Sequence, residues 1–136
     1  MGHALREIHR VLAPNGILLD IRPISGDTPL EVVRDGKIEL AGYYDEPRDH
    51  PDDVAANNAV ARAVRRGTFD RERDGQFRFA YYWETVDEMR DYVKKKWTAT
   101  RLPWRVSRKA RRLMASGAGK IRARVIVVIT RLRKVN

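Results

Sequence analysis

The sequence predicts a mixed α/β or α+β domain in which helices flank a sheet. Segments with the 3.6-residue period of a helix alternate along the chain with segments that have the two-residue period of a strand. Apolar residues make up 43% of the 136 residues and charged residues 34%, which is typical of a globular protein and not of a disordered one. Because single hydrophobic cores usually span roughly 100 to 200 residues, we expect one domain over residues 1–136.

The chain opens with a predicted helix, a tight turn and a strand. HALREIHRVLA, residues 3–13, places its large apolar side chains on one stripe of a helix. The APNG that follows ends the helix, because proline cannot continue it and the asparagine and glycine after it tolerate a left-handed backbone. ILLDI, residues 17–21, is apolar without alternation, which predicts a strand covered on both faces, as in a parallel sheet. Arg22 and Pro23 are expected to end this strand.

The middle of the chain predicts one strand and one helix between loops. Residues 23–29 are expected to form a loop, and KIELAGYY, residues 37–44, has the alternation of a half-buried strand. A helix then follows from Asp52 or Asp53, either of which can cap its first turn, to Arg66. Its expected buried residues include Val54, Ala61 and Val64.

The clearest strand pattern is QFRFAYYWE, residues 76–84, in which aromatic side chains occupy every second position. Four aromatics at this spacing are ordinary for the buried face of a strand, so we expect most of them in the core. Aromatic side chains together with the arginines downstream are also the combination that holds single-stranded nucleic acids. The residues expected in the core are Phe77, Phe79 and Trp83, with Arg78 and Tyr82 on the other face.

Two helices and a long strand complete the predicted order of elements. TVDE, residues 85–88, has the form of a capping box, in which the threonine and the glutamate each bond a free backbone N–H. It opens a helix that runs to Trp97, and Pro103 opens a second, basic helix that runs to Ala115. KIRARVIVVITRLRK, residues 120–134, has an apolar centre between alternating ends and is predicted to be a strand.

The charge of the chain is divided unequally along its length. Lys and Arg number 28 and Asp and Glu 18, for a net charge of +10, yet residues 94–136 carry 15 basic side chains and none that is acidic. Such a segment attracts polyanions, among them RNA, DNA and acidic lipid headgroups. The alternative is that it docks on the acidic first part of the same fold and otherwise serves solubility. The candidate polyanion-binding residues are Lys94, Lys95, Lys96, Arg101, Arg105, Arg108, Lys109, Arg111 and Arg112.

No catalytic or metal-binding group can be assigned from the sequence. The absence of cysteine excludes disulfides, thiolate nucleophiles and cysteine-bound metals, and His3, His9 and His50 lack the spacing of metal ligands. DEPRDHPDD, residues 45–53, could bind a cation or act as acid and base, but we interpret it as a solvated loop because nothing supplies a rigid ligand set. SGAGK, residues 116–120, departs from a nucleotide-binding phosphate loop and is interpreted as the turn that ends a helix.

The sequence also predicts a cytoplasmic protein that does not span a membrane. The N-terminus lacks the apolar core of a signal peptide. The longest apolar run, VIVVI at 125–129, is far shorter than the roughly 20 residues that a membrane helix needs.

Residues 4–23, ALREIHRVLAPNGILLDIRP, resemble the helix, turn and strand of class I S-adenosylmethionine-dependent methyltransferases, which have a Rossmann-like fold. In that family a pattern of the type E-x-x-R-V-L-x-P-G-G leads into the fifth strand. VIVVITRLRK near the C-terminus looks like the closing strand of these enzymes, so the resemblance implies a partial Rossmann-like sheet with an antiparallel C-terminal strand, flanked by helices. The matching residues are Glu7, Arg10, Val11, Leu12, Pro14 and Gly16, and Asn15 replaces the first glycine.

The resemblance divides the chain into three segments and omits the cofactor site of the family. Residues 1–23 are of methyltransferase type, residues 24–75 form a loop-rich insert with a strand and a helix, and residues 76–136 add a strand, two helices and the basic terminal strand. The family binds S-adenosylmethionine through a glycine-rich loop and an acidic residue in the first half of its fold. The chain starts at Met1 about where the family's fourth strand has ended. The resemblance therefore implies that the cofactor-binding half is missing, and that the chain alone binds no cofactor and is not catalytic.

Loss of that half would expose a hydrogen-bonding edge of the ILLDI strand. Because an unpaired apolar edge readily accepts another strand, we expect a homodimer or a complex with a separately encoded cofactor-binding half. Two other functions stay open. The chain could be a nucleic-acid-binding module that uses its basic segment, or it could be the substrate-recognition part of a split methyltransferase, in which the acceptor pocket would involve Tyr43, Tyr44 and Tyr82.

Overall fold

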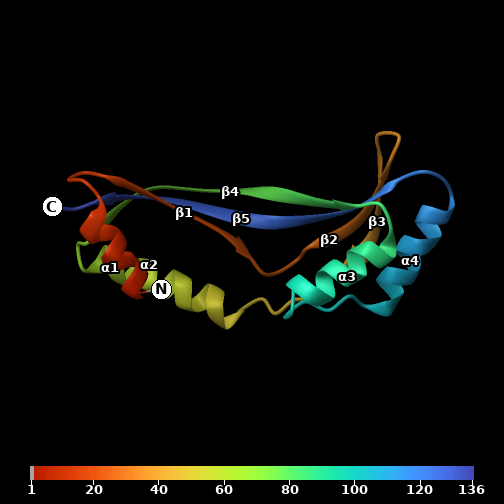
Figure 1. The fold of residues 1–136 in the computed structure, drawn as a ribbon, viewed down its shortest axis with the longest axis horizontal. Coiled ribbons are helices and arrows are strands. Elements are labelled where there is room, and N and C mark those ends of the chain that lie inside the picture. Colours follow the sequence, from red (N-terminus) through yellow and green to blue (C-terminus); the bar gives the residue numbers. More distant parts are fainter. Residues whose placement is uncertain (1) are drawn as a thin grey trace. The chain divides into compact units, whose positions relative to one another are not determined.

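The computed structural model describes residues 2–136, which form four helices and five strands (Figure 1). The strands make a sheet that helices flank, so the predicted mixed α/β or α+β class is confirmed. Among the described residues, no helix combines the length and the apolarity needed to cross a membrane. In chain order the elements are α1 (Gly2–Val11), β1 (Ile17–Ile24), β2 (Pro29–Arg34), β3 (Lys37–Tyr43), α2 (Pro51–Arg65), β4 (Phe69–Trp83), α3 (Val86–Lys96), α4 (Trp104–Ala115) and β5 (Lys120–Lys134).

The strand β5 pairs with β1, β2 and β4, and β2 pairs in turn with β3. The backbone N–H of Lys134 donates to the carbonyl of Gly16 at 2.8 Å, and that of Val135 donates to the carbonyl of Thr68 at 3.1 Å. β1 and β4 therefore both begin beside the end of β5 and run antiparallel to it, which confirms the predicted antiparallel C-terminal strand. Among the described residues β1 has no second partner strand, so one of its edges is free.

The backbone divides into two compact units, which we describe separately. Unit 1 comprises the residues up to Ile24, Asp49–Phe77 and Val127–Asn136, and unit 2 comprises Ser25–Arg48 and Arg78–Ile126. The strands β4 and β5 contribute residues to both units. The expectation of a single domain stays a prediction.

Unit 1 packs α1 and α2 against one face of its strands. Phe69 of β4 and Leu132 of β5 are fully buried in this core. Leu5 of α1 and the pair Ala59 and Val60 of α2 pack against them and are almost completely buried. The small alanine side chain lets the helix approach the strands closely, as the alanine-rich sequence of α2 predicts.

The prediction that β1 is covered on both faces is wrong. Its residues alternate between exposed and half-buried, with Ile17 41%, Leu19 52% and Ile21 53% exposed, while Leu18 packs into the core. The reason is that α1 and α2 cover only one face, so the apolar side chains of the other face remain open. β1 also continues through Pro23, because an edge strand tolerates a residue that cannot donate a backbone hydrogen bond.

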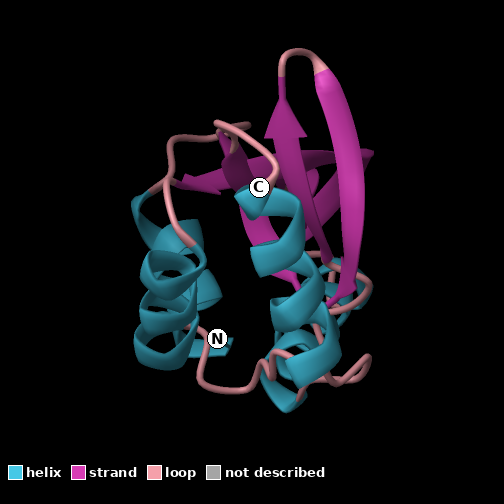
Figure 2. Cartoon of the chain, turned by 90° about the vertical axis from the view of Figure 1, so that its right-hand side faces the viewer, coloured by secondary structure: helices cyan, strands magenta, loops and turns pink. Residues whose placement is uncertain are grey.

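Unit 2 is built on a hairpin of β2 and β3, which a short loop joins (Figure 2). The turn consists of Asp35 and Gly36, whose φ angles are 47° and 74°, as a two-residue hairpin requires. β2 is absent from the sequence prediction, although the Asp-Gly pair between apolar segments is a recognised hairpin signal. The helices α3 and α4 cover one face, and the fully buried residues of this core are Leu30, Val32, Met89, Ala110, Ile121 and Ala123.

The ends of two helices test the predicted caps. The Oγ1 of Thr85 accepts a hydrogen bond from the N–H of Glu88 at 3.1 Å, so the predicted cap of α3 is confirmed. The cap of α2 is His50, whose Nδ1 accepts from the N–H of Asp52 at 3.3 Å, so the prediction of Asp52 or Asp53 as cap is wrong. The proline at the first position of α2 explains the shift, because its fixed φ angle starts the helix one or two residues earlier. Val54 is 42% exposed and does not belong to the core.

The aromatic residues of β4 are split between core and surface. Trp83 packs against the unit 2 core as predicted, with its ring 5.5 Å from that of Tyr92. Phe77 and Phe79 are 48% and 51% exposed, so their predicted burial is wrong. No helix of their own unit covers the side chains at these positions, and the alternation alone could not reveal this.

Candidate functional site

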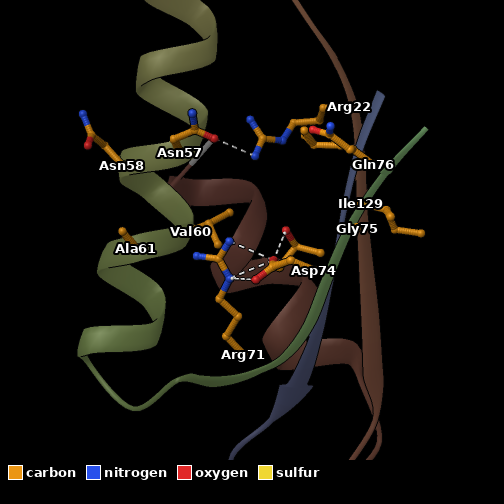
Figure 3. A pocket seen from close by; sticks show the side chains of 12 residues that line it. Arg22, Asn57, Asn58, Val60, Ala61, Arg71, Asp74, Gly75, Gln76 and Ile129 are labelled. Atoms are coloured by element: carbon orange, nitrogen blue, oxygen red, sulfur yellow. Dashed lines mark hydrogen bonds and ion pairs between the residues drawn. The ribbon is translucent and has the colours of Figure 1, made fainter. Parts of the chain in front are cut away.

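Unit 1 contains a groove of about 620 Å³ beside α2 (Figure 3). Arg22 near the end of β1 and Asn57 on α2 point toward each other across it, while Arg71 and Asp74 of β4 meet below them. The apolar floor includes Val60. The polar side chains that line the groove are Arg22, Asn57, Asn58, Arg71, Asp74, Gln76 and Thr130.

Arg22 is held in this groove by fixed acceptors. Its Nε lies 3.0 Å from each carboxylate oxygen of Asp20, and its Nη2 donates to the Oδ1 of Asn57 at 3.0 Å. The third guanidinium nitrogen, Nη1, is buried and has no hydrogen-bond partner among the described residues. Because a buried donor without an acceptor is unfavourable, an acceptor placed beside this atom would stabilise the groove.

The carboxylate on the other side of the groove is already paired. Asp74 accepts from the Nε of Arg71 at 2.8 and 2.9 Å and from the Oγ1 of Thr130 at 2.9 Å. The hydrogen bond from Arg71, which outweighs the effect of burial, holds the pKa of Asp74 below its ordinary value, with a smaller contribution from Thr130. Asp74 is therefore an ionised, engaged group and not a general base with a pKa near neutrality.

The groups that line the groove suit binding of a ligand. Residues 2–136 contain no group of three or more side chains that could hold a metal ion. The groove presents amide and guanidinium groups, and its one carboxylate is neutralised by an arginine. These groups suit a small polar or anionic ligand, whereas acid–base or nucleophilic catalysis would need a free titratable group.

The uncovered face of unit 2 carries a second cavity, of about 430 Å³. It contains a buried carboxylate, Glu31, between two arginines: Arg122 Nε lies 2.7 Å from Oε2, and Arg124 Nη2 lies 2.7 Å from Oε1. Burial raises the pKa of Glu31, but the hydrogen bonds and charges of Arg124 and Arg122 together hold it below its ordinary value. The cavity is lined by Asp27, Pro29, Leu40, Tyr43, Arg78 and Arg124, in addition to Glu31.

The three tyrosines predicted for an acceptor pocket lie in two environments. Tyr43 lines this cavity and is 52% exposed. Tyr82 is 53% exposed. Burial lowers the pKa of Arg122, but the hydrogen bond to Glu31, followed by that to the Tyr82 hydroxyl, raises it above its ordinary value. Tyr44 is 4% exposed, with its ring 5.6 Å from that of Trp97. Burial, and secondarily the charge of Glu46, raise the pKa of Tyr44, so its hydroxyl stays protonated.

The candidate polyanion-binding residues are all exposed and lie on or next to α3 and α4. Arg111 forms an ion pair with Asp87 of α3. Within the described residues the other eight have no ion-pair partner, so their charge is not neutralised by unit 2: Lys94, Lys95, Lys96, Arg101, Arg105, Arg108, Lys109 and Arg112.

Three features of these surfaces lie outside the sequence prediction. Trp104, the first residue of α4, is 64% exposed. The sequence could have predicted this exposure, because Trp104 lies outside the apolar stripe of the helix. Glu31 could have been noticed as the lone acidic residue within PLEVV, although nothing in the sequence indicated its arginine partners. The contact between Arg22 and Asn57 could not have been predicted, because 35 residues separate them in the sequence.

Comparisons with protein-family models, with curated proteins and with solved structures found no match to this chain.

Proposed function

We propose that this chain is the acceptor side of a methyltransferase-like fold and that a cofactor-binding half docks on β1. The observation that carries the proposal is the free edge of β1, together with its exposed apolar side chains Ile17, Leu19 and Ile21. This strand belongs to the stretch, residues 4–23, that resembles class I methyltransferases. In that resemblance the strand lies inside a sheet, so a partner strand would supply what β1 lacks.

The exposed stripe of β1 can contribute substantially to such an assembly. Complete burial of a leucine or isoleucine stabilises by about 1.5 to 3 kcal/mol, and these three side chains are about half exposed. Covering them would therefore add about 2 to 4 kcal/mol, apart from the hydrogen bonds of the strand edge. Exposed apolar residues on an unpaired strand are also an aggregation hazard, which a docked partner removes.

The chain itself would contribute recognition of the methyl acceptor. S-adenosylmethionine, when bound by the partner, would supply the methyl group. The open face of unit 2 presents side chains that suit acceptor recognition, because Tyr43, Arg78 and Arg124 line the same cavity. These groups would orient a planar or anionic acceptor by stacking and hydrogen bonding. A cytoplasmic location is part of this proposal.

The test is reconstitution with a cofactor-binding half. Coding DNA next to this reading frame would be searched for a glycine-rich loop that follows a predicted strand, and that product would be co-expressed with the chain. We expect a one-to-one complex by sedimentation velocity, which binds S-adenosylmethionine in calorimetry where the chain alone does not. The variant Leu19→Lys/Ile21→Lys should abolish the complex, because two charges would be buried at the docking strand.

A matched control separates docking from general surface effects. Ile38→Lys/Leu40→Lys changes two alternate residues of β3 that are 56% and 42% exposed, and it should leave the complex intact. Both variants should fold, because surface substitutions usually change stability by less than about 0.5 kcal/mol. Three results would contradict the proposal: binding of S-adenosylmethionine by the chain alone, equal effects of the two variants, or a dimer of the chain alone that the β1 variant dissociates.

A further inference from the structure

We propose that the solvent face of α4 binds single-stranded nucleic acid, with Trp104 as the stacking surface and four cations as phosphate contacts. Arg105, Arg108, Lys109 and Arg112 stand at positions i, i+3, i+4 and i+7, so they form one stripe along the helix. All four are exposed and have no ion-pair partner among the described residues. This inference does not depend on the docking of a partner on β1.

Trp104 lies at one end of this stripe. The residue is 64% exposed, and the guanidinium carbons of Arg105 and Arg108 lie 5.6 and 6.0 Å from the centroid of its ring. These distances are within the range of cation–π interactions, which hold the ring and the two cations together. An exposed indole beside arginines is the arrangement on which unpaired bases stack while their phosphates are neutralised.

Of the four cations of the stripe, the helix dipole favours only Arg112, which lies in the last turn of α4. The first turn of α4 has no acidic residue and carries Arg105, although the helix dipole disfavours a cation at that end. The like charges of Arg105 and Lys109 at i and i+4 also repel each other. In contrast, Lys94, Lys95 and Lys96 lie in the last turn of α3, where the helix dipole favours cations. The dipole alone explains the position of these three lysines.

A nucleic acid fits this face better than a lipid surface does. A helix that lies on a membrane inserts an apolar face flanked by cations. The apolar side of α4 is already used within unit 2, where Ala110 is fully buried and Val106 and Leu113 pack against the core. Only Trp104 remains to insert. A strand of unpaired nucleotides instead supplies both the phosphates and the aromatic faces that this surface complements.

The test uses a dye-labelled single-stranded RNA of 12 nucleotides, measured by fluorescence anisotropy with the full chain. Four phosphate contacts predict a slope of about −3 for log K against log salt, so affinity should fall about 50-fold between 50 and 200 mM salt. Arg105→Gln/Arg108→Gln/Lys109→Gln/Arg112→Gln should remove this salt dependence and weaken binding at 50 mM at least tenfold. Trp104→Ala should weaken binding about tenfold without changing the slope, and Trp104→Phe should retain most of the affinity.

The matched control removes four other cations. Arg6→Gln/Arg62→Gln/Arg65→Gln/Arg66→Gln changes exposed arginines of unit 1 that have no ion pair in the described residues, and it lowers the net charge by the same amount. It should change the affinity less than twofold. The proposal is overturned if this control weakens binding as much as the α4 variant, or if Trp104→Ala has no effect. It is also overturned if the chain binds vesicles of phosphatidylserine and phosphatidylcholine but not the RNA.

Discussion

Glu31→Gln should lower the free energy of unfolding by about 3 kcal/mol, measured by urea denaturation at pH 7. The Glu31 side chain is 6% exposed and that of Arg122 is 13% exposed. Removing one member of a buried ion pair leaves an uncompensated charge, which usually costs about 3 to 5 kcal/mol. The lower figure applies here because Arg124, the second partner, is 38% exposed and retains some hydration.

The double variant Glu31→Leu/Arg122→Leu provides the control for this prediction. It removes both buried charges and replaces them with apolar side chains, which is often close to neutral. Its stability should therefore exceed that of Glu31→Gln. If the free energy of unfolding of Glu31→Gln stays within about 0.5 kcal/mol of the wild-type value, the Glu31 carboxylate forms no stabilising ion pair with these arginines in solution.

The same pair makes stability depend on pH in a defined direction. The pKa of Glu31 is lower in the folded chain than its ordinary value of 4.5. The unfolded chain therefore takes up this proton first as the pH falls, so the stabilisation is present above about pH 4.5 and is lost below it. Between pH 6 and 3 the wild type should lose more stability than Glu31→Gln, since the amide does not titrate. Parallel curves would contradict this assignment.

Local signals in the sequence predicted the elements whose ends depend on neighbouring residues. The strand 120–134 has the predicted bounds of β5, and the Thr85 cap starts α3 as predicted. Both depend on residues within a few positions of one another, where spacing alone carries the information. The Asp35–Gly36 turn belongs to the same class and was available to sequence reasoning.

The features that sequence reasoning missed depend on distant segments. The two-sided burial expected for β1 failed because apolar composition does not say whether a helix covers one face or both. The ion pairs of Glu31 join residues 91 and 93 positions apart, so no local pattern could reveal them. The groove at Arg22 could not be predicted for the same reason, because it forms only when β1 and α2 pack together in one unit.

Phe69→Ala should cost about 3 to 5 kcal/mol and lower the melting temperature by more than about 10 °C. Phe69 is fully buried in unit 1, where it packs with Leu132 and its ring lies 5.4 Å from that of His9. Truncation would leave a cavity that a core of two helices on one sheet face cannot refill. If the alanine variant does not fold, Phe69→Leu, which leaves a smaller cavity, supplies a measurable loss.

Phe77→Ala is the matched control, because it makes the same change on the same strand in the same unit. Phe77 is 48% exposed, so its truncation should cost less than about 1 kcal/mol. The difference between the two variants measures the division of β4 into a buried position at Phe69 and an exposed position at Phe77, which the aromatic alternation could not predict. Equal losses would contradict that division. A loss for Phe77→Ala that grows with protein concentration would mean that a second copy covers this face, because stability that depends on association follows mass action.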